Sequence, residues 1–186
     1  METFNLYRDI AERTNGDIYI GVVGPTRTGK STFVTNFMQS LVIPNIADAN
    51  ARTRAVDELP QSADGLAVMT TQPKFVPNEA VSVSLDETTQ ANVRLIDCVG
   101  YVAEGVAETE DRMVKTPWSS EEMPFRQAAE FGTSKVVNEH STIAVVVTND
   151  GSIGELPRSN YVSAEERVIE ELKQSQKPFI VVLNGK

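Results

Sequence analysis

The chain has 186 residues, 40% of them hydrophobic, which is enough for one domain with a substantial core and too few for two ordinary domains. Its 17 basic and 26 acidic residues give a net charge of −9, which excludes nucleic acid and anionic membrane surfaces as favoured direct partners. With one cysteine, one histidine and no long apolar run, the composition predicts one cytoplasmic domain without an internal disulfide, a zinc site or direct membrane insertion.

Helices and strands are predicted to alternate along the chain. A helix is expected over residues 4–14. The continuous apolar run at residues 18–23 is typical of a strand that is covered on both faces. A second helix is expected over residues 30–42, because its apolar side chains recur on one face and Pro44 prevents its continuation.

The same alternation continues to the last residues. Its members are a helix around 47–59, strands over 81–85 and 93–96, a helix over 124–139, a strand over 142–147, a helix through Ala164, Val168 and Leu172, and a strand over 179–183. The acidic stretch from Gly100 to Met123 is predicted to be a long loop that is either mobile or functional. Strands separated by helices predict one α/β domain over residues 1–186, with a mostly parallel central sheet and helices on both faces. Because the chain stops directly after its last predicted strand, we expect an N-terminal fragment of a longer protein.

Residues 24–31 have the pattern G-x-x-x-x-G-K-S, between the buried strand and the amphipathic helix. The glycines let successive backbone N–H groups point at phosphate oxygens, and the helix directs its positive dipole end at the same anion. Lys30 supplies a charge for the β- and γ-phosphates, and the Ser31 hydroxyl can ligate Mg²⁺. The predicted nucleotide-binding residues are Gly24, Pro25, Thr26, Arg27, Thr28, Gly29, Lys30, Ser31, Thr32 and Gly100.

Arg27 allows two interpretations. In the first, it is an outward-facing, solvated side chain. In the second, its guanidinium reaches the γ-phosphate and acts as a cation supplied within the same chain.

Asp97 and Gly100 form a D-x-x-G pattern at the end of a predicted strand. An aspartate there can hold a water of the Mg²⁺ shell, and a glycine three residues later lets its N–H approach the γ-phosphate. Thr70 or Thr71 can add a hydroxyl to Mg²⁺ in the triphosphate state, and the spacing leaves open which of them does so. We assign the metal to Ser31, Thr71 and Asp97, and the chemistry to Lys30, Asp97, Arg27 and the two threonines.

The order of phosphate loop, threonine and D-x-x-G resembles the translation-factor-related branch of P-loop GTPases. Two features depart from that branch. Its guanine-reading N-K-x-D run would follow a late strand, where this chain has Asn184-Gly185-Lys186. Tyr101 stands where a water-orienting glutamine or histidine often lies, so turnover is expected to be slow unless another group or a neighbouring subunit orients the water.

Longer strings resemble the N-terminal domain of the stage IV sporulation protein A family, at residues 9–14, 27–33, 57–63, 73–77, 97–101, 116–118, 139–143 and 164–172. The resemblance implies an ATPase with a GTPase-like P-loop NTPase fold, and ATP and Mg²⁺ as cofactors. It implies Lys30 as the phosphate-loop lysine, Asp97 as the Mg²⁺-linked acid and Thr70 or Thr71 as the sensor threonine.

The same resemblance implies a spore-coat protein on the mother-cell side of the forespore, whose hydrolysis drives self-assembly. Its implied partners are further copies of itself and, through regions outside this chain, a small amphipathic membrane peptide and other coat proteins. Three other functions remain as alternatives: a GTP-binding regulatory switch, a small-molecule kinase, and a domain that binds nucleotide only to fold.

Overall fold

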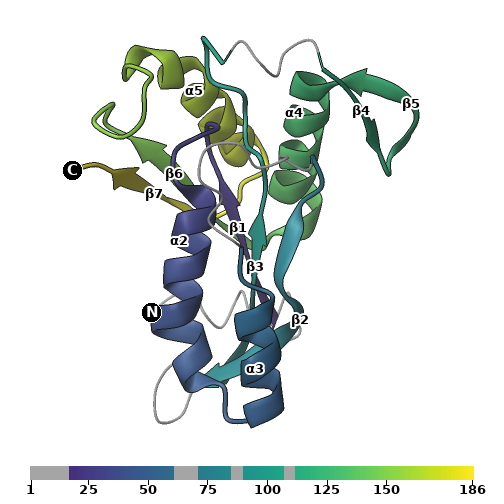
Figure 1. Ribbon diagram of the computed structural model, residues 1–186, viewed down its shortest axis with the longest axis vertical. Coiled ribbons are helices and arrows are strands. Elements are labelled where there is room, and N and C mark those ends of the chain that lie inside the picture. Colours follow the sequence, from purple (N-terminus) through teal and green to yellow (C-terminus); the bar gives the residue numbers. More distant parts are fainter. Residues whose placement is uncertain (1–16, 61–70, 85–89, 107–111) are drawn as a thin grey trace, which may run out of the picture.

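The computed structural model describes residues 17–60, 71–84, 90–106 and 112–186 (Figure 1). The helix expected over residues 4–14 and the candidate Thr70 lie outside these ranges. The strands are β1 (Asp17–Val23), β2 (Lys74–Ser84), β3 (Gln90–Asp97), β4 (Met113–Thr116), β5 (Ser119–Pro124), β6 (Ile143–Asn149) and β7 (Phe179–Asn184). The helical elements are α2 (Lys30–Phe37), η1 (Met38–Val42), η2 (Ile43–Asn45), α3 (Ala49–Asp57), α4 (Phe125–Lys135), η4 (Val136–His140) and α5 (Ser159–Gln174).

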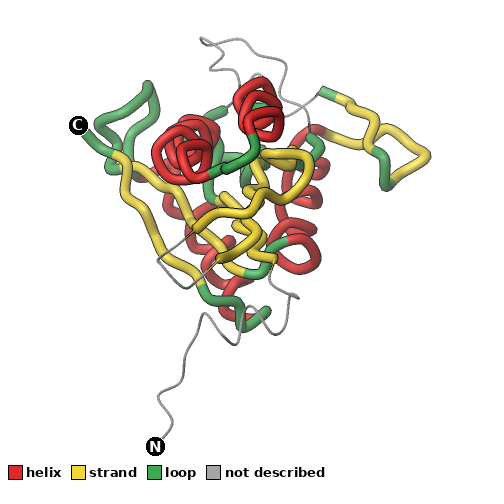
Figure 2. The backbone as a smooth tube through the Cα atoms, turned by 90° about the horizontal axis from the view of Figure 1, so that it is seen from below, coloured by secondary structure: helices red, strands yellow, loops and turns green. Residues whose placement is uncertain are grey.

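The core of the fold is a five-stranded sheet with the order β2-β3-β1-β6-β7. Strands β3, β1, β6 and β7 are parallel, and β2 joins the edge of the sheet antiparallel to β3. Helical elements pack on both faces (Figure 2). The predicted fold class, an α/β domain with a mostly parallel sheet, is therefore confirmed.

Alternation along the central strands divides the core into two layers. Val145 and Val147 of β6 face a cluster with α2, η1 and α3, whereas Ala144 and Val146 face a cluster with η4 and α5. Because successive side chains of a strand point to opposite faces, a continuous apolar run is what a strand buried on both faces requires. The apolar runs of β1 and β6 therefore lie where the sheet is covered, whereas Ile180, Val181 and Leu183 of the edge strand β7 are exposed.

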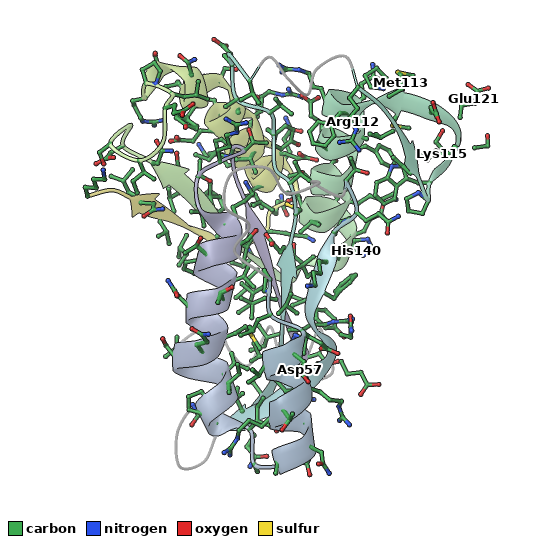
Figure 3. The ribbon with its side chains drawn as sticks, in the orientation of Figure 1. Asp57, Arg112, Met113, Lys115, Glu121 and His140 are labelled. Carbon is green, nitrogen blue, oxygen red and sulfur yellow. The ribbon has the colours of Figure 1, made fainter. Side chains whose placement is uncertain are left out.

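The region from Gly100 to Met123 was predicted to be one long loop, and the structure differs from this prediction. It contains a hairpin, β4–β5, that projects beside α4, with Arg112, Lys115 and Glu121 along it (Figure 3). Strand β5 has the sequence Ser-Ser-Glu-Glu-Met-Pro, which carries no apolar alternation. The hairpin therefore left no strand signature in the sequence.

Strand β2 also begins earlier than predicted, at Lys74 and not at Val81. The pairing register shifts between Val76 and Val81, and Pro77 lies within this irregular part. A proline and a shifted register interrupt the regular alternation by which a strand is recognised, and so only the second half was predicted.

Candidate functional site

The phosphate loop joins the carboxyl end of β1 to the start of α2 at Lys30. Because β1 lies between β3 and β6, the carboxyl ends of both neighbouring strands flank the loop (Figure 1). This edge of a parallel sheet is where ligands of open α/β folds bind. Asp97 ends β3 and Asn184 ends β7 at this same edge.

Two glycines give the loop its shape. Gly24 has φ +131° and Gly29 has φ +91°, a region that side chains rarely adopt. A side chain on Gly24 would collide with the carbonyl of Val147, and a Cβ on Gly29 would lie 2.6 Å from Nδ2 of Asn184. Both positions of the G-x-x-x-x-G pattern therefore require glycine in this fold.

Hydrogen bonds hold the loop to the neighbouring strands. The fully buried Thr28 donates its hydroxyl to the carbonyl of Val147 at 2.8 Å, and Asn184 Nδ2 donates to the carbonyl of Thr28 at 3.1 Å. On the other side, Thr26 Oγ1 accepts a hydrogen bond from the N–H of Ala103 at 3.1 Å. The loop is thus preorganised, which lowers the ordering cost of binding an anion.

Lys30 lies inside this loop with only 5% of its surface exposed. Its Nζ donates to the carbonyl of Pro25 at 2.5 Å. Burial lowers the pKa of Lys30, and the negative charge of Asp97 acts in the opposite direction. A buried ammonium whose hydrogen bond goes to a neutral carbonyl gains strongly from an anionic ligand such as a phosphate.

Asp97 and Ser31 meet directly. Ser31 Oγ donates to Asp97 Oδ2 at 2.6 Å, whereas the buried Oδ1 has no hydrogen-bond partner among the described residues. Burial raises the pKa of Asp97, while the Ser31 hydrogen bond and the charge of Lys30 lower it. Mg²⁺ prefers hard oxygen ligands and keeps several bound waters, which carboxylates can hold. The Ser31 hydroxyl and the Asp97 carboxylate are such oxygen groups, so these residues fit that ion.

Gly100 packs against the phosphate loop with φ +92°. A side chain there would collide with the carbonyl of Gly24, and its Cβ would lie 2.7 Å from Lys30 Nζ. Its N–H donates to Thr133 Oγ1 of α4 at 3.1 Å. Gly100 therefore lies next to Lys30, while its N–H is bonded to α4.

Tyr101 connects the same segment to α5. Its backbone pairs with the loop, since Thr26 N–H donates to the Tyr101 carbonyl at 2.8 Å. Its buried hydroxyl donates to Glu171, and the Arg167 guanidinium lies 4.8 Å from the ring centre. Burial and Glu171 raise the pKa of Tyr101. The side chain is therefore held in the core beside α5 and does not replace a water-orienting glutamine.

The remaining predicted residues are placed less centrally. Thr71 is buried, and its carbonyl lies against Gly132 of α4. That contact does not involve the other predicted metal ligands, and the assignment of Thr71 to the metal stays a prediction. Arg27 is exposed with φ +61°, and Thr32 is exposed on the first turn of α2. The structure joins Ser31, Asp97, Lys30 and Gly100 in one site, and the proposed role of Arg27 as a cation also stays a prediction.

Two residues that contact the site were not predicted for it. Asn184 was noted only as the end of a strand, although it binds the loop carbonyl of Thr28. Thr133 lies within a predicted helix, and its position on the apolar face gives no sign of a contact with the site. The signal available for it was the pair Gly132-Thr133, because small residues inside a helix often mark a close approach of another segment.

Comparison with known proteins was consistent across the whole chain. The matching family model is described as Stage IV sporulation protein A, ATPase domain, and it covers residues 1–186. Two proteins named Stage IV sporulation protein A, from Bacillus anthracis and Bacillus subtilis (strain 168), are each 58% identical to this chain. The alignments cover 99% and 100% of the chain, respectively. The protein of that name from Clostridioides difficile (strain 630) is 54% identical to 97% of it. The chain spans 38% of the length of each of these relatives.

Proposed function

The chain belongs to the ATPase-domain family of stage IV sporulation protein A, and on this premise we propose that it binds ATP with Mg²⁺ and hydrolyses it to ADP and phosphate. The observation that carries this proposal is the buried Lys30 in a preformed phosphate loop, beside the hydrogen-bonded Ser31 and Asp97. These groups give one cation for the phosphates and two oxygen ligands on one edge of the sheet.

The chemistry assigned to these residues is mainly positioning and charge neutralisation, as is usual in phosphoryl transfer. The Lys30 ammonium neutralises charge on the terminal phosphates, and loop N–H groups hold the β-phosphate. When bound, Mg²⁺ supplies positive charge to the β- and γ-phosphate oxygens. Ser31 and Asp97 would hold it, Asp97 through the oxygen that has no partner among the described residues. Because the Tyr101 hydroxyl is bonded to Glu171, we expect slow turnover.

The end of β7 supports a base other than guanine. Gly185 stands where an N-K-x-D run would have lysine. A side chain at position 185 would collide with the carboxylate of Asp150. The lysine of a guanine-reading run is therefore replaced by glycine at this position, and a side chain there would require the exposed carboxylate of Asp150 to move.

Base preference is tested by measuring phosphate release from ATP and from GTP, each with Mg²⁺ or with EDTA. We expect ATP to be preferred about 10-fold or more, because an unmatched base leaves polar groups unpaired. We also expect phosphate release to require Mg²⁺. A preference for GTP would contradict the assignment and favour the regulatory switch. Phosphate appearing on an acceptor other than water would indicate a kinase, and bound nucleotide without release would indicate a structural role.

We propose that hydrolysis causes a conformational change in the longer protein. This change would drive self-assembly of a spore-coat layer on the mother-cell side of the forespore. The support is the family membership and the sporulation names of the relatives. Further copies of the protein are the proposed partners, and the amphipathic peptide and other coat proteins would bind outside this chain. Within the described residues, no helix is long and apolar enough to cross a membrane.

Assembly is tested with the full-length protein, by sedimentation after incubation with ATP, ADP or a nonhydrolysable ATP analogue, each with Mg²⁺. We expect pelleted protein to increase with ATP only, because a step driven by hydrolysis requires cleavage of the anhydride. Equal pelleting with the analogue would show that binding suffices and would refute the role of hydrolysis.

A further inference from the structure

The N–H of Gly100 has an acceptor in this structure that a phosphate would have to replace. The acceptor is Oγ1 of Thr133, at 3.1 Å, on a residue that is fully buried. Gly100 itself touches the phosphate loop, since a Cβ there would lie 2.7 Å from Lys30 Nζ. The N–H that is expected to meet the γ-phosphate is therefore bonded to α4 at the edge of the nucleotide site.

The Thr133 hydroxyl is held so that it accepts from Gly100. It donates its own proton to the carbonyl of Ala129, one helical turn earlier, at 2.8 Å. With that proton used, a lone pair of Oγ1 remains for the N–H of Gly100. One N–H makes one full-strength hydrogen bond, so a bond to Thr133 and a bond to a phosphate oxygen exclude each other.

The neighbouring residue of the same turn contacts the other predicted phosphate-sensing segment. A Cβ on Gly132 would lie 2.7 Å from the carbonyl of Thr71 and 3.5 Å from Trp118 Cζ2. The turn Gly132-Thr133 of α4 therefore contacts both segments from which groups for the γ-phosphate were predicted.

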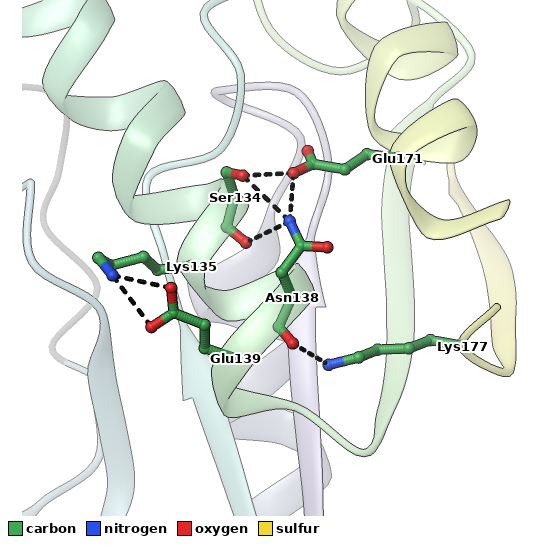
Figure 4. A network of polar contacts seen from close by, with 6 residues as sticks. All are labelled: Ser134, Lys135, Asn138, Glu139, Glu171 and Lys177. Atoms are coloured by element: carbon green, nitrogen blue, oxygen red, sulfur yellow. Dashed lines mark hydrogen bonds and ion pairs between the residues drawn. The ribbon is translucent and has the colours of Figure 1, made fainter. Parts of the chain in front are cut away.

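The next residue of α4 is bound to α5. Ser134 and Asn138 both donate to Glu171, Asn138 at 2.6 Å (Figure 4). The hydroxyl of Tyr101, the residue after Gly100, donates to the same carboxylate. Direct contacts therefore connect the Gly100 segment with the interface between α4 and α5.

We propose that Thr133 is a positioning residue that competes with the γ-phosphate for the N–H of Gly100, so that α4 distinguishes a bound triphosphate from a diphosphate. The inference rests on the proposed function. With ADP, Gly100 stays on Thr133. With ATP, the charged phosphate oxygen is the stronger acceptor and takes the N–H.

The test compares the affinities of the 186-residue protein for Mg²⁺-ADP and for Mg²⁺-adenylyl imidodiphosphate, by calorimetry, in the wild type and in Thr133→Val. Valine keeps the shape and removes the acceptor, so the unliganded state loses a hydrogen bond that the triphosphate state does not use. We expect the ratio of analogue affinity to ADP affinity to rise about 2- to 10-fold. Thr133→Ser restores the hydroxyl and should return the ratio to the wild-type value.

Thr53→Val is the matched control, because Thr53 makes the same kind of bond to the carbonyl one turn earlier, at 3.0 Å to Ala49, on an exposed part of α3. It should leave the ratio unchanged. If the valine variant does not fold, Thr133→Cys, whose thiol is a weak acceptor, should raise the ratio in the same direction. An unchanged ratio, or equal changes for both nucleotides, would overturn the inference while leaving the proposed function intact. Wild-type protein that binds neither nucleotide would overturn both.

Discussion

Replacement of Lys30 with alanine is expected to reduce kcat/KM for ATP hydrolysis roughly 100-fold or more, the cost of removing one preorganised group that meets developing charge. The ammonium is buried and donates to the carbonyl of Pro25, so it is held in place before a nucleotide arrives. The measurement is steady-state phosphate release with saturating Mg²⁺. The fold should tolerate the change, because burial of the ammonium disfavours its charged form in the unliganded protein.

Lys173→Ala is the control for this experiment. Lys173 is exposed in the last turn of α5, so its loss removes the same charge from the protein without altering the loop. It should keep wild-type turnover. Equal activity of Lys30→Ala and wild type would exclude the phosphate loop as the site of hydrolysis.

Asp97→Asn should be the second most damaging change, lowering Mg²⁺-dependent turnover by about 100-fold. It should also raise the Mg²⁺ concentration needed for half-maximal rate. An amide keeps the size of the side chain and removes the negative charge that we propose to hold the metal-bound water. The thermal midpoint without nucleotide should not fall, because Asp97 carries a buried oxygen that has no partner among the described residues, a costly feature that asparagine relieves in part.

The pH dependence gives an independent measurement of the same group. Burial raises the pKa of Asp97, so on acidification it takes up a proton at a higher pH than an exposed aspartate does. The apparent Mg²⁺ affinity of the wild type should therefore weaken on acidification at a higher pH than an exposed carboxylate would give, and this dependence should be absent in Asp97→Asn. The control is Asp57→Asn, at the exposed end of α3, which should retain the wild-type profile (Figure 3). A retained Mg²⁺ response in Asp97→Asn would assign the metal elsewhere.

The centre of the site was predictable because it is encoded locally. The phosphate loop needs its glycines, lysine and serine at fixed spacing, and Asp97 was predicted because it ends an apolar strand. Thr28, Lys30 and Asp97 are then brought together by parallel strands that end at one edge of the sheet.

The parts that could not be predicted depend on contacts between distant segments. The bond from Gly100 to Thr133 joins residues 33 positions apart, and that from Asn184 to Thr28 joins residues 156 positions apart. The spacing of apolar residues along the sequence predicts helices and strands, but it does not indicate which distant residues form a hydrogen bond. The β4–β5 hairpin was missed for a related reason, because few of its residues are apolar and its attachment depends on distant contacts. One of its anchors on α4 is Trp118, which packs on Phe131 with 5.7 Å between ring centres.

That anchor has a practical consequence. Trp118 is the single tryptophan of the chain, so all indole emission comes from one place. The ring lies against the turn of α4 that also meets the Thr71 carbonyl, and its buried Nε1 has no acceptor among the described residues. Emission wavelength and quenching therefore sense the polarity and solvent access of that turn. The unlabelled protein therefore contains a fluorescent reporter beside the helix turn that contacts both segments predicted to meet the γ-phosphate.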